Sequence, residues 1–118
     1  MANSTDRQVG ATTGAGSYQT AGQIAGTFSA GGVQIVCPTG TAASLDYVVQ
    51  RSVEFSPGIA DADDWHDVGS GTVTAGGRAI VDPCAGIVIR NIRVRVKRNG
   101  AGAESAYRVN LAGVDAHR

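Results

Sequence analysis

The residues that could do chemistry in this 118-residue sequence are few, and they are scattered. Nucleophilic catalysis needs a base beside the nucleophile, but the only histidines are His66 and His117. The only glutamates are Glu54 and Glu104, so a catalytic carboxylate pair would have to come from loop aspartates. The two cysteines lack histidines at the spacing of a zinc site. We therefore expect no catalytic residue, no metal ion and no cofactor, so that the chain is not an enzyme.

Aspartates cluster in one short segment, where Asp61, Asp63 and Asp64 are followed by Asp67. Several carboxylates could ligate a calcium ion, but the spacing and the glycine of an EF-hand loop are absent. The simpler interpretation is a solvated acidic loop, and calcium binding stays open as the alternative. In either case these side chains are candidates for pairing with a positively charged partner.

Cations gather in a different segment, Ile92–Lys97, in which apolar and charged residues alternate. Side chains in a β-strand point alternately to two faces, so this segment predicts a strand with one buried face. Arg93, Arg95 and Lys97 would share the opposite, solvated face. No aromatic residue accompanies them, and the formal net charge of the chain is zero. Because single-strand binders place aromatic residues beside their cations, we expect no nucleic-acid partner.

The residues just before that strand have the opposite parity. Ile87 and Ile89 alternate with each other but are out of phase with Ile92. Both halves can face one core only if the chain contains a bulge or a change of phase near Arg90 and Asn91.

Short alternating segments recur through the rest of the chain, separated by glycine, proline or aspartate. No window shows helical periodicity. The sequence therefore predicts an all-β fold, an antiparallel β-sandwich of immunoglobulin-like or jelly-roll type, with about eight short strands. The expected strands are Gln23–Phe28, Val33–Cys37, Asp46–Ser56, Trp65–Val68, Thr72–Thr74, Arg78–Val81, Ile87–Arg98 and Ser105–Ala112.

The same alternation assigns a core, which should also include the only tryptophan. Gly31 and Gly32 should turn the chain between the first two strands as a hairpin. Cys37 and Cys84 should be buried thiols, with a disulfide between them left open. The expected core residues are Phe28, Ile35, Val49, Val53, Phe55, Trp65, Ile92, Val94, Val96, Val109 and Leu111.

The first 20 residues differ in composition from the rest of the chain. Met1–Thr20 is rich in Gly, Ser, Thr and Ala, and its only large apolar side chains are Val9 and Tyr18. Such a segment cannot bury enough surface to order by itself, so we expect a flexible N-terminal arm that orders against a partner. The expected division is this arm, a sandwich domain over residues 21–113 and a short tail over residues 114–118.

No apolar run reaches the roughly 18 residues that a membrane span needs, and the N-terminus lacks the pattern of a signal peptide. The sequence therefore predicts a protein that is made in the cytoplasm and has no membrane partner.

Together, these features resemble the small β-sandwich structural proteins of tailed bacteriophages, namely capsid decoration (cement) proteins and related head or tail accessory subunits. The resemblance lies in the arm Met1–Thr20, the strands Asp46–Ser56 and Ile92–Lys97, the loop ending in Trp65–Val68, and the missing signal peptide. It implies a non-catalytic virion protein, made in the host cytoplasm, that binds the major capsid protein or other virion proteins as a homo-oligomer.

Two other classes stay open. A carbohydrate-binding β-sandwich module would share the fold and could stack a sugar on Trp65, Tyr47 or Tyr107, although aromatic residues make up only 5% of the chain. The third class is a fragment of a larger enzyme or fibre. If the chain binds a protein surface, the candidate contact residues are Arg93, Arg95, Lys97, Asp61, Asp63, Asp64, Val9 and Tyr18.

Overall fold

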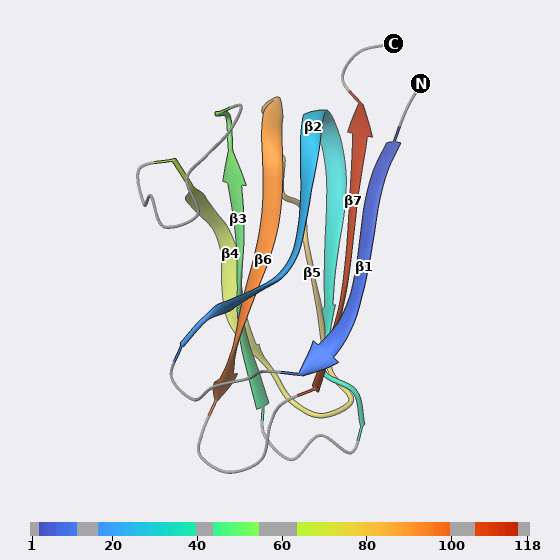
Figure 1. Cartoon of the computed structure of the whole chain (residues 1–118), viewed down its shortest axis with the longest axis vertical. Helices are drawn as coiled ribbons and strands as arrows, with labels where there is room; N and C mark the ends of the chain where they lie inside the picture. The colour runs from blue at the N-terminus through green and yellow to red at the C-terminus, as the bar shows by residue number, and fades with distance from the viewer. Residues whose placement is uncertain (1–2, 12–16, 40–43, 55–63, 100–105, 116–118) are drawn as a thin grey trace.

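A computed structural model of the chain describes residues 3–11, 17–39, 44–54, 64–99 and 106–115. Over these residues, seven strands form one open antiparallel sheet (Figure 1). The strand order is β1-β7-β2-β6-β3-β4, and β5 pairs with β2 off that path. The strands are Asn3–Ala11 (β1), Gln19–Val36 (β2), Ser44–Ser52 (β3), His66–Val73 (β4), Arg78–Val81 (β5), Ile89–Asn99 (β6) and Ala106–Asp115 (β7).

The predicted all-β, antiparallel class is confirmed, with seven strands in place of about eight. Two pairs of expected strands are merged, into β2 and into β4, and β1 is added. The immunoglobulin-like and jelly-roll arrangements stay predictions. No helix in the described part of the chain is long and apolar enough to cross a membrane.

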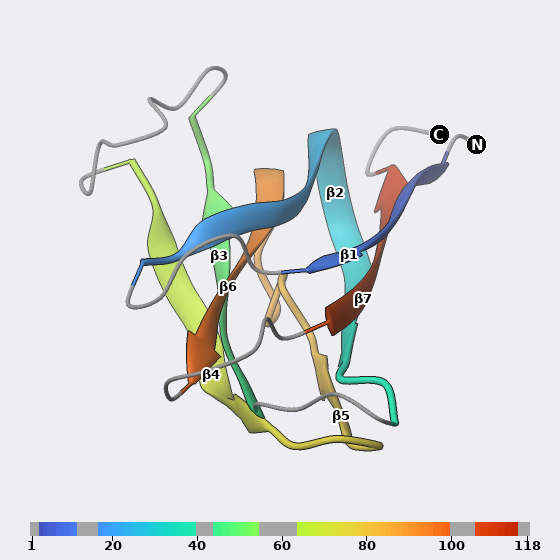
Figure 2. The ribbon, with the colours of Figure 1, turned by 60° about the horizontal axis from the view of Figure 1, so that its bottom comes forward.

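Strand β2 joins two parts of the sheet, because the chain reverses direction within it (Figures 1 and 2). Its first half pairs antiparallel with β6, from Gln19 opposite Val96 to Phe28 opposite Ile89. Its second half pairs antiparallel with β7 on one side and with β5 on the other. The sheet is thereby bent into two limbs. The first limb contains β4, β3, β6 and the first half of β2, and the second limb contains β5, the second half of β2, β7 and β1.

This reversal corrects the hairpin expected at Gly31 and Gly32. The two glycines lie inside the strand, opposite Gly113 and Ala112 of β7. The chain changes direction near Phe28 instead, where the register shifts against both β6 and β7. Local sequence could not reveal this, because each half of β2 has an ordinary strand pattern whichever strand it pairs with.

The hydrophobic core is built from inward side chains of both limbs. Cys37 and Cys84 belong to it, and they are free thiols with no disulfide between them. Many predicted core residues are confirmed by their place in this cluster, namely Phe28, Ile35, Val49, Ile92, Val94, Val96, Val109 and Leu111.

Two of the remaining core predictions concern the end of β3. Val53 was wrong, since its side chain is 51% exposed. The reason is that β3 ends at Ser52, so the alternation of the strand no longer applies beyond it. Phe55 lies outside the described residues. Trp65 is buried as predicted, but it lies outside the main core cluster.

The change of phase predicted near Arg90 is not in β6 itself, because β6 pairs with β3 without a register shift. The irregularity lies on the neighbouring strand β2, between Ala25 and Phe28. Ile89 is fully buried, whereas Ile87 precedes the strand and is 46% exposed. The register shift therefore lies opposite the predicted position, in the partner strand β2.

The segment expected to be a flexible arm contains β1, which pairs with β7 from Asn3 to Ala11. Without β1, this side of β7 would expose a row of unpaired backbone N–H and C=O groups. Asp6 adds a contact to the first limb, because its Oδ2 accepts a hydrogen bond from the backbone N–H of Gln23 at 3.2 Å. The arm prediction is thus corrected for the residues of β1, and the other predicted boundaries stay predictions.

The turn before β6 is held by Arg51, whose Nη1 donates hydrogen bonds to the carbonyl oxygens of Cys84 and Pro83. Asp82 caps the same turn, since its Oδ1 accepts from the backbone N–H groups of Cys84 at 3.0 Å and Ala85 at 3.2 Å. Burial, and then the charge of Asp82, raise the pKa of the Cys84 thiol against the opposing charge of Arg51. The thiol is therefore held neutral in the core.

We predict that Gly113→Ala destabilises the fold by about 1–3 kcal/mol, the range for overpacking a core. A Cβ at Gly113 would lie 2.5 Å from Cδ1 of the buried Phe28 ring. Gly32→Ala is the matched control, because its Cβ would meet nothing within 4 Å. Urea unfolding of both variants measures the difference. Equal losses of unfolding free energy would contradict this account of the Phe28 contact.

Candidate functional site

The cations predicted on one face of β6 do share the outer face of the first limb. Each of these cations lies opposite a residue of β3, which in turn lies opposite a residue of β4. We call this surface the ladder face, defined by the cross-strand rows that start from Arg93, Arg95 and Lys97. The rows are Lys97–Asp46–Thr72, Arg95–Val48–Ser70 and Arg93–Gln50–Asp67.

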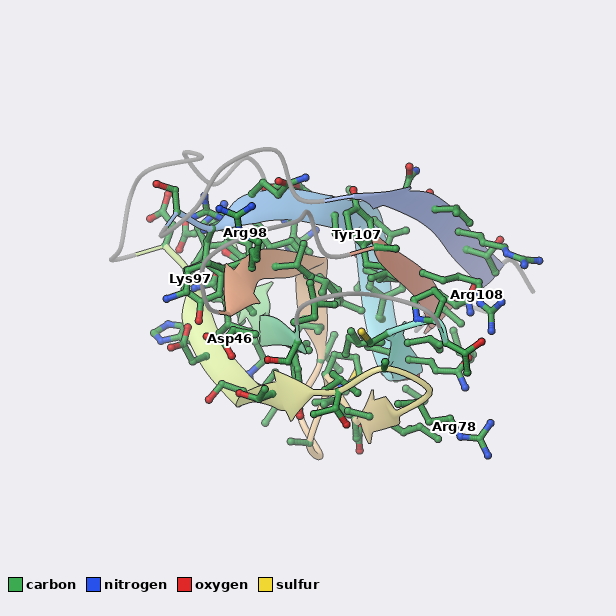
Figure 3. The ribbon with its side chains drawn as sticks, turned by 90° about the horizontal axis from the view of Figure 1, so that it is seen from below. Asp46, Arg78, Lys97, Arg98, Tyr107 and Arg108 are labelled. Atoms are coloured by element: carbon green, nitrogen blue, oxygen red, sulfur yellow. The ribbon has the colours of Figure 1, made fainter. Side chains whose placement is uncertain are left out.

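Lys97 is engaged within the molecule. Its Nζ lies 4.0 Å from Oδ2 of Asp46 and 4.8 Å from the centroid of the Tyr18 ring. Asp46 in turn accepts a hydrogen bond of 2.6 Å from the Thr72 hydroxyl. Figure 3 shows Lys97 and Asp46 on the same side of the molecule. This row is therefore a local ion pair, of the kind that contributes little to stability at a surface.

Arg93 departs furthest from the prediction, because its side chain is only 4% exposed. Its guanidinium stacks on the Trp65 ring, 4.0 Å from the ring centroid, and its Nε donates to Oε1 of Gln50 at 2.7 Å. Gln50 also donates a hydrogen bond, from its Nε2 to Oδ1 of Asp67 at 2.8 Å. Burial, and then the charge of Arg95, lower the pKa of Arg93, while Asp67 opposes the shift. Arg93 is therefore a structural residue packed on the Trp65 ring. This corrects its prediction as an exposed contact residue.

Arg95 lies between these rows at the edge of a hollow of about 300 Å³. Its Nη2 donates to the backbone oxygen of Tyr18 at 3.2 Å. Its Nε is buried and has no hydrogen-bond partner in the described part of the chain. The hollow is lined by Tyr18, Val48, Gln50, Asp67, Ser70 and Arg95.

The other predicted contact residues are spread over the molecule. Asp61 and Asp63 lie outside the described residues. Asp64 is half-buried and makes contacts of its own. Tyr18 lies on the ladder face, and Val9, which is 72% exposed, lies on the other limb. Of the described candidates, Tyr18, Arg95 and Lys97 therefore share the ladder face, whereas Val9 lies apart from them.

The second limb has an outer face that sequence analysis missed. Arg78 and Arg108 both lie opposite Val36, and Arg108 also lies opposite Val9. In the next row, Arg7 lies opposite Asn110 of β7. We call this surface the arginine face, defined by Arg7, Arg78, Arg108, Val9 and Ile80.

Two properties show that the described residues leave the arginine face without ion pairs and without a covering segment. None of its three arginines forms an ion pair with a described residue. A hollow of about 520 Å³ lies over β1, β7, β2 and β5, where Gly32 and Ala112 provide little side-chain bulk. Ile80, which is 74% exposed, lines it. Figure 3 shows Arg78 and Arg108 on the side of the molecule away from Lys97 and Asp46.

One signal in the sequence could have indicated this face. Arg78–Val81 alternates, so a strand there places Arg78 and Ile80 on the same side. What the sequence could not show is that β5 pairs with β2 beside β7, which brings Arg108 into the same row. Both faces present charged and polar side chains, which suit contact with a partner molecule. No group of three histidine, cysteine or acidic side chains that could hold a metal ion exists within the described ranges.

Of the aromatic residues that a carbohydrate-binding module would use, Trp65 and Tyr107 are buried. Tyr47 is partly buried and packs against the core. A stacking surface made from these three rings is therefore not available in this fold.

We predict that Arg93→Ala lowers the free energy of unfolding by roughly 1.5–3 kcal/mol, the range for hydrogen bonds to charged groups. The emission of Trp65, the only tryptophan, should shift to longer wavelength because the ring loses its cover. Arg78→Ala, on an exposed arginine, is the matched control and should change stability by less than about 0.5 kcal/mol. Unchanged emission and stability in Arg93→Ala would show that the stack does not contribute.

No protein-family model matches the chain, and no curated protein matches it. Among solved structures, a chain from the structure of infectious bursal disease virus, Gx strain, matches with a TM-score of 0.46 and 13% identity, over 99% of this chain and 34% of that chain. The Yersinia pseudotuberculosis-derived mitogen matches with a TM-score of 0.46 and 11% identity, over 99% of this chain and 88% of that chain.

This chain spans about a third of the length of the matched viral chain. Both likenesses are distant, with TM-scores below 0.5, and they carry no argument about function. The chain therefore has a distant structural similarity to a chain of a virus structure and to a bacterial mitogen, and belongs to no family that these comparisons establish.

Proposed function

We propose that this protein is a non-catalytic structural subunit of a virion, which binds the assembled capsid lattice, or a head or tail lattice, as a decoration or cement protein. Its partners are the major capsid protein or other virion proteins, and its place is the virion, after synthesis in the host cytoplasm. The observation that carries the proposal is the arginine face, where three arginines form no ion pair with a described residue and a largely apolar hollow, lined by Arg7 and Ile80, lies on the same face.

The arginine face has the composition of a protein-binding surface. Exposed aliphatic side chains such as Val9 and Ile80 release water when a partner covers them. Arginine is enriched at the centres of protein interfaces, because its planar guanidinium makes several directed hydrogen bonds to carboxylates. The partner that fits is therefore a protein surface with carboxylates around an apolar projection. Ion pairs there would set the orientation, and the apolar hollow would supply affinity.

A capsid lattice suits such a face because it repeats the same partner surface many times. One hollow of about 520 Å³, on a face with three arginines, is a small contact for a single subunit. Copies that also touch one another would convert later contacts into effectively intramolecular ones, so many weak contacts would add. We therefore propose that the protein acts as a homo-oligomer on the lattice.

The test is cosedimentation with purified capsids of the virus that encodes the chain. The double variant Arg78→Ala, Arg108→Ala should bind roughly thirtyfold more weakly, because a loss of about 1 kcal/mol for each of two interface arginines sums to about 2 kcal/mol. The remaining binding should lose part of its dependence on salt, since fewer ion pairs form.

The matched control is Arg95→Ala with Lys97→Ala, which removes the same charge from the ladder face. This variant should bind capsids like the unmodified protein. If the control loses binding and the arginine-face variant does not, then the interface is on the ladder face. If the unmodified protein binds no capsid and stays monomeric in sedimentation equilibrium, the virion function is wrong.

A further inference from the structure

The hollow in the ladder face holds polar groups whose hydrogen bonds are incompletely used. We propose that it is a binding site for a saccharide, gripped through two neighbouring hydroxyl groups by Arg95 and Asp67. This site lies on the limb that the proposed capsid contact does not use, and the inference does not depend on that function.

The donor side of the site is Arg95. One of its nitrogens, Nη2, is fixed by the backbone oxygen of Tyr18 at 3.2 Å, which holds the guanidinium in place. Its Nε is buried and has no partner among the described residues. The third nitrogen, Nη1, is not buried and has no hydrogen-bond partner among the described residues, so it can donate to an oxygen atom of a ligand. The hollow that Arg95 lines is where such an oxygen would enter.

The acceptor side is Asp67, whose carboxylate is aimed by a chain of contacts. Gln50 donates to Oδ1 of Asp67 at 2.8 Å, and Arg93 donates to Gln50 at 2.7 Å. Arg93 is itself clamped on Trp65. Oδ1 is thus occupied, while Oδ2 has no hydrogen-bond partner within the described ranges. Asp67 can therefore accept a hydrogen bond from a hydroxyl group without rearranging, which is the preorganisation that a weak ligand needs.

The floor of the hollow between Arg95 and Asp67 is low because cross-strand register places short side chains there. Arg95 lies opposite Val48, and Val48 lies opposite Ser70. Both Val48 and Ser70 have short side chains, while the row of Gln50 and Asp67 beside them carries longer ones. Tyr18 borders the same hollow and is 37% exposed. A ligand seated there meets an apolar floor, an aromatic edge and polar groups on two sides.

The chemistry of these groups selects a neutral polyhydroxyl ligand. The lining of the hollow holds one guanidinium and one carboxylate, so a ligand that both donates and accepts hydrogen bonds suits it better than a simple anion or cation. A hydroxyl group both donates and accepts, so neighbouring hydroxyls can satisfy Arg95 and Asp67 together. The volume of about 300 Å³ is at the small end of ligand sites, which fits one or two sugar rings.

The test uses the full chain labelled with ¹⁵N and titrated with glucose, galactose, mannose, rhamnose and N-acetylglucosamine. At least one sugar should shift the backbone amide resonances of residues 48, 50, 67 and 70, which border the hollow. Arg95→Gln should weaken that binding roughly tenfold or more, the loss expected for one charge-assisted hydrogen bond. Arg78→Gln removes the same charge from the arginine face and should leave the affinity unchanged.

Ser70→Val provides an independent test, because it fills the floor of the hollow and leaves the Gln50–Asp67 hydrogen bond in place. It should abolish sugar binding while the amide spectrum keeps the dispersion of a folded sheet. The inference is overturned if none of the five sugars shifts these resonances. It is also overturned if the shifts map to another surface, or if Arg95→Gln and Ser70→Val bind as well as the unmodified protein.

Discussion

The burial of Phe28 at the point where β2 reverses is the constraint on which the rest of this structure depends. The ring is 1% exposed, and Gly113 of β7 lies directly against it without a side chain. Because Phe28 pairs with Ile89 in one limb and Asp115 in the other, it belongs to both. Fixing this residue fixes how the limbs face each other, and the apolar side chains of both limbs then share one core.

The register of the strands decides what each outer face carries. Residues directly opposite in an antiparallel sheet share a face, so inward alternation of the core residues forces their neighbours outward. On the first limb this places Lys97 beside Asp46, and Arg93 beside Gln50 and Trp65. The ladder face therefore neutralises its charges internally. On the second limb the same rule places arginines beside aliphatic residues, and no such neutralisation occurs there among the described residues.

This contrast explains why charge segregation in the sequence is a poor guide to which cations form ion pairs within the described part of the chain. The densest run of cations in the sequence contains Arg93, Arg95 and Lys97. In the structure these three side chains are, respectively, stacked on Trp65, hydrogen-bonded to a backbone oxygen and paired with Asp46. Arg7, Arg78 and Arg108, which form no ion pair with a described residue, are far apart in the sequence. They come together only because β1, β5 and β7 are packed around the second half of β2.

The sequence by itself determined the all-β class, most of the core and the shared face of the cations on β6, because alternation is a local property of each strand. It could not determine that Asn3–Ala11 joins the sheet, since that strand is stabilised by the open edge of β7. Nor could it determine the burial of Arg93, which depends on contacts with Trp65 and Gln50 from other parts of the chain. Strand order, the reversal near Phe28 and both outer faces were decided by tertiary structure, because they are contacts between residues distant in the chain.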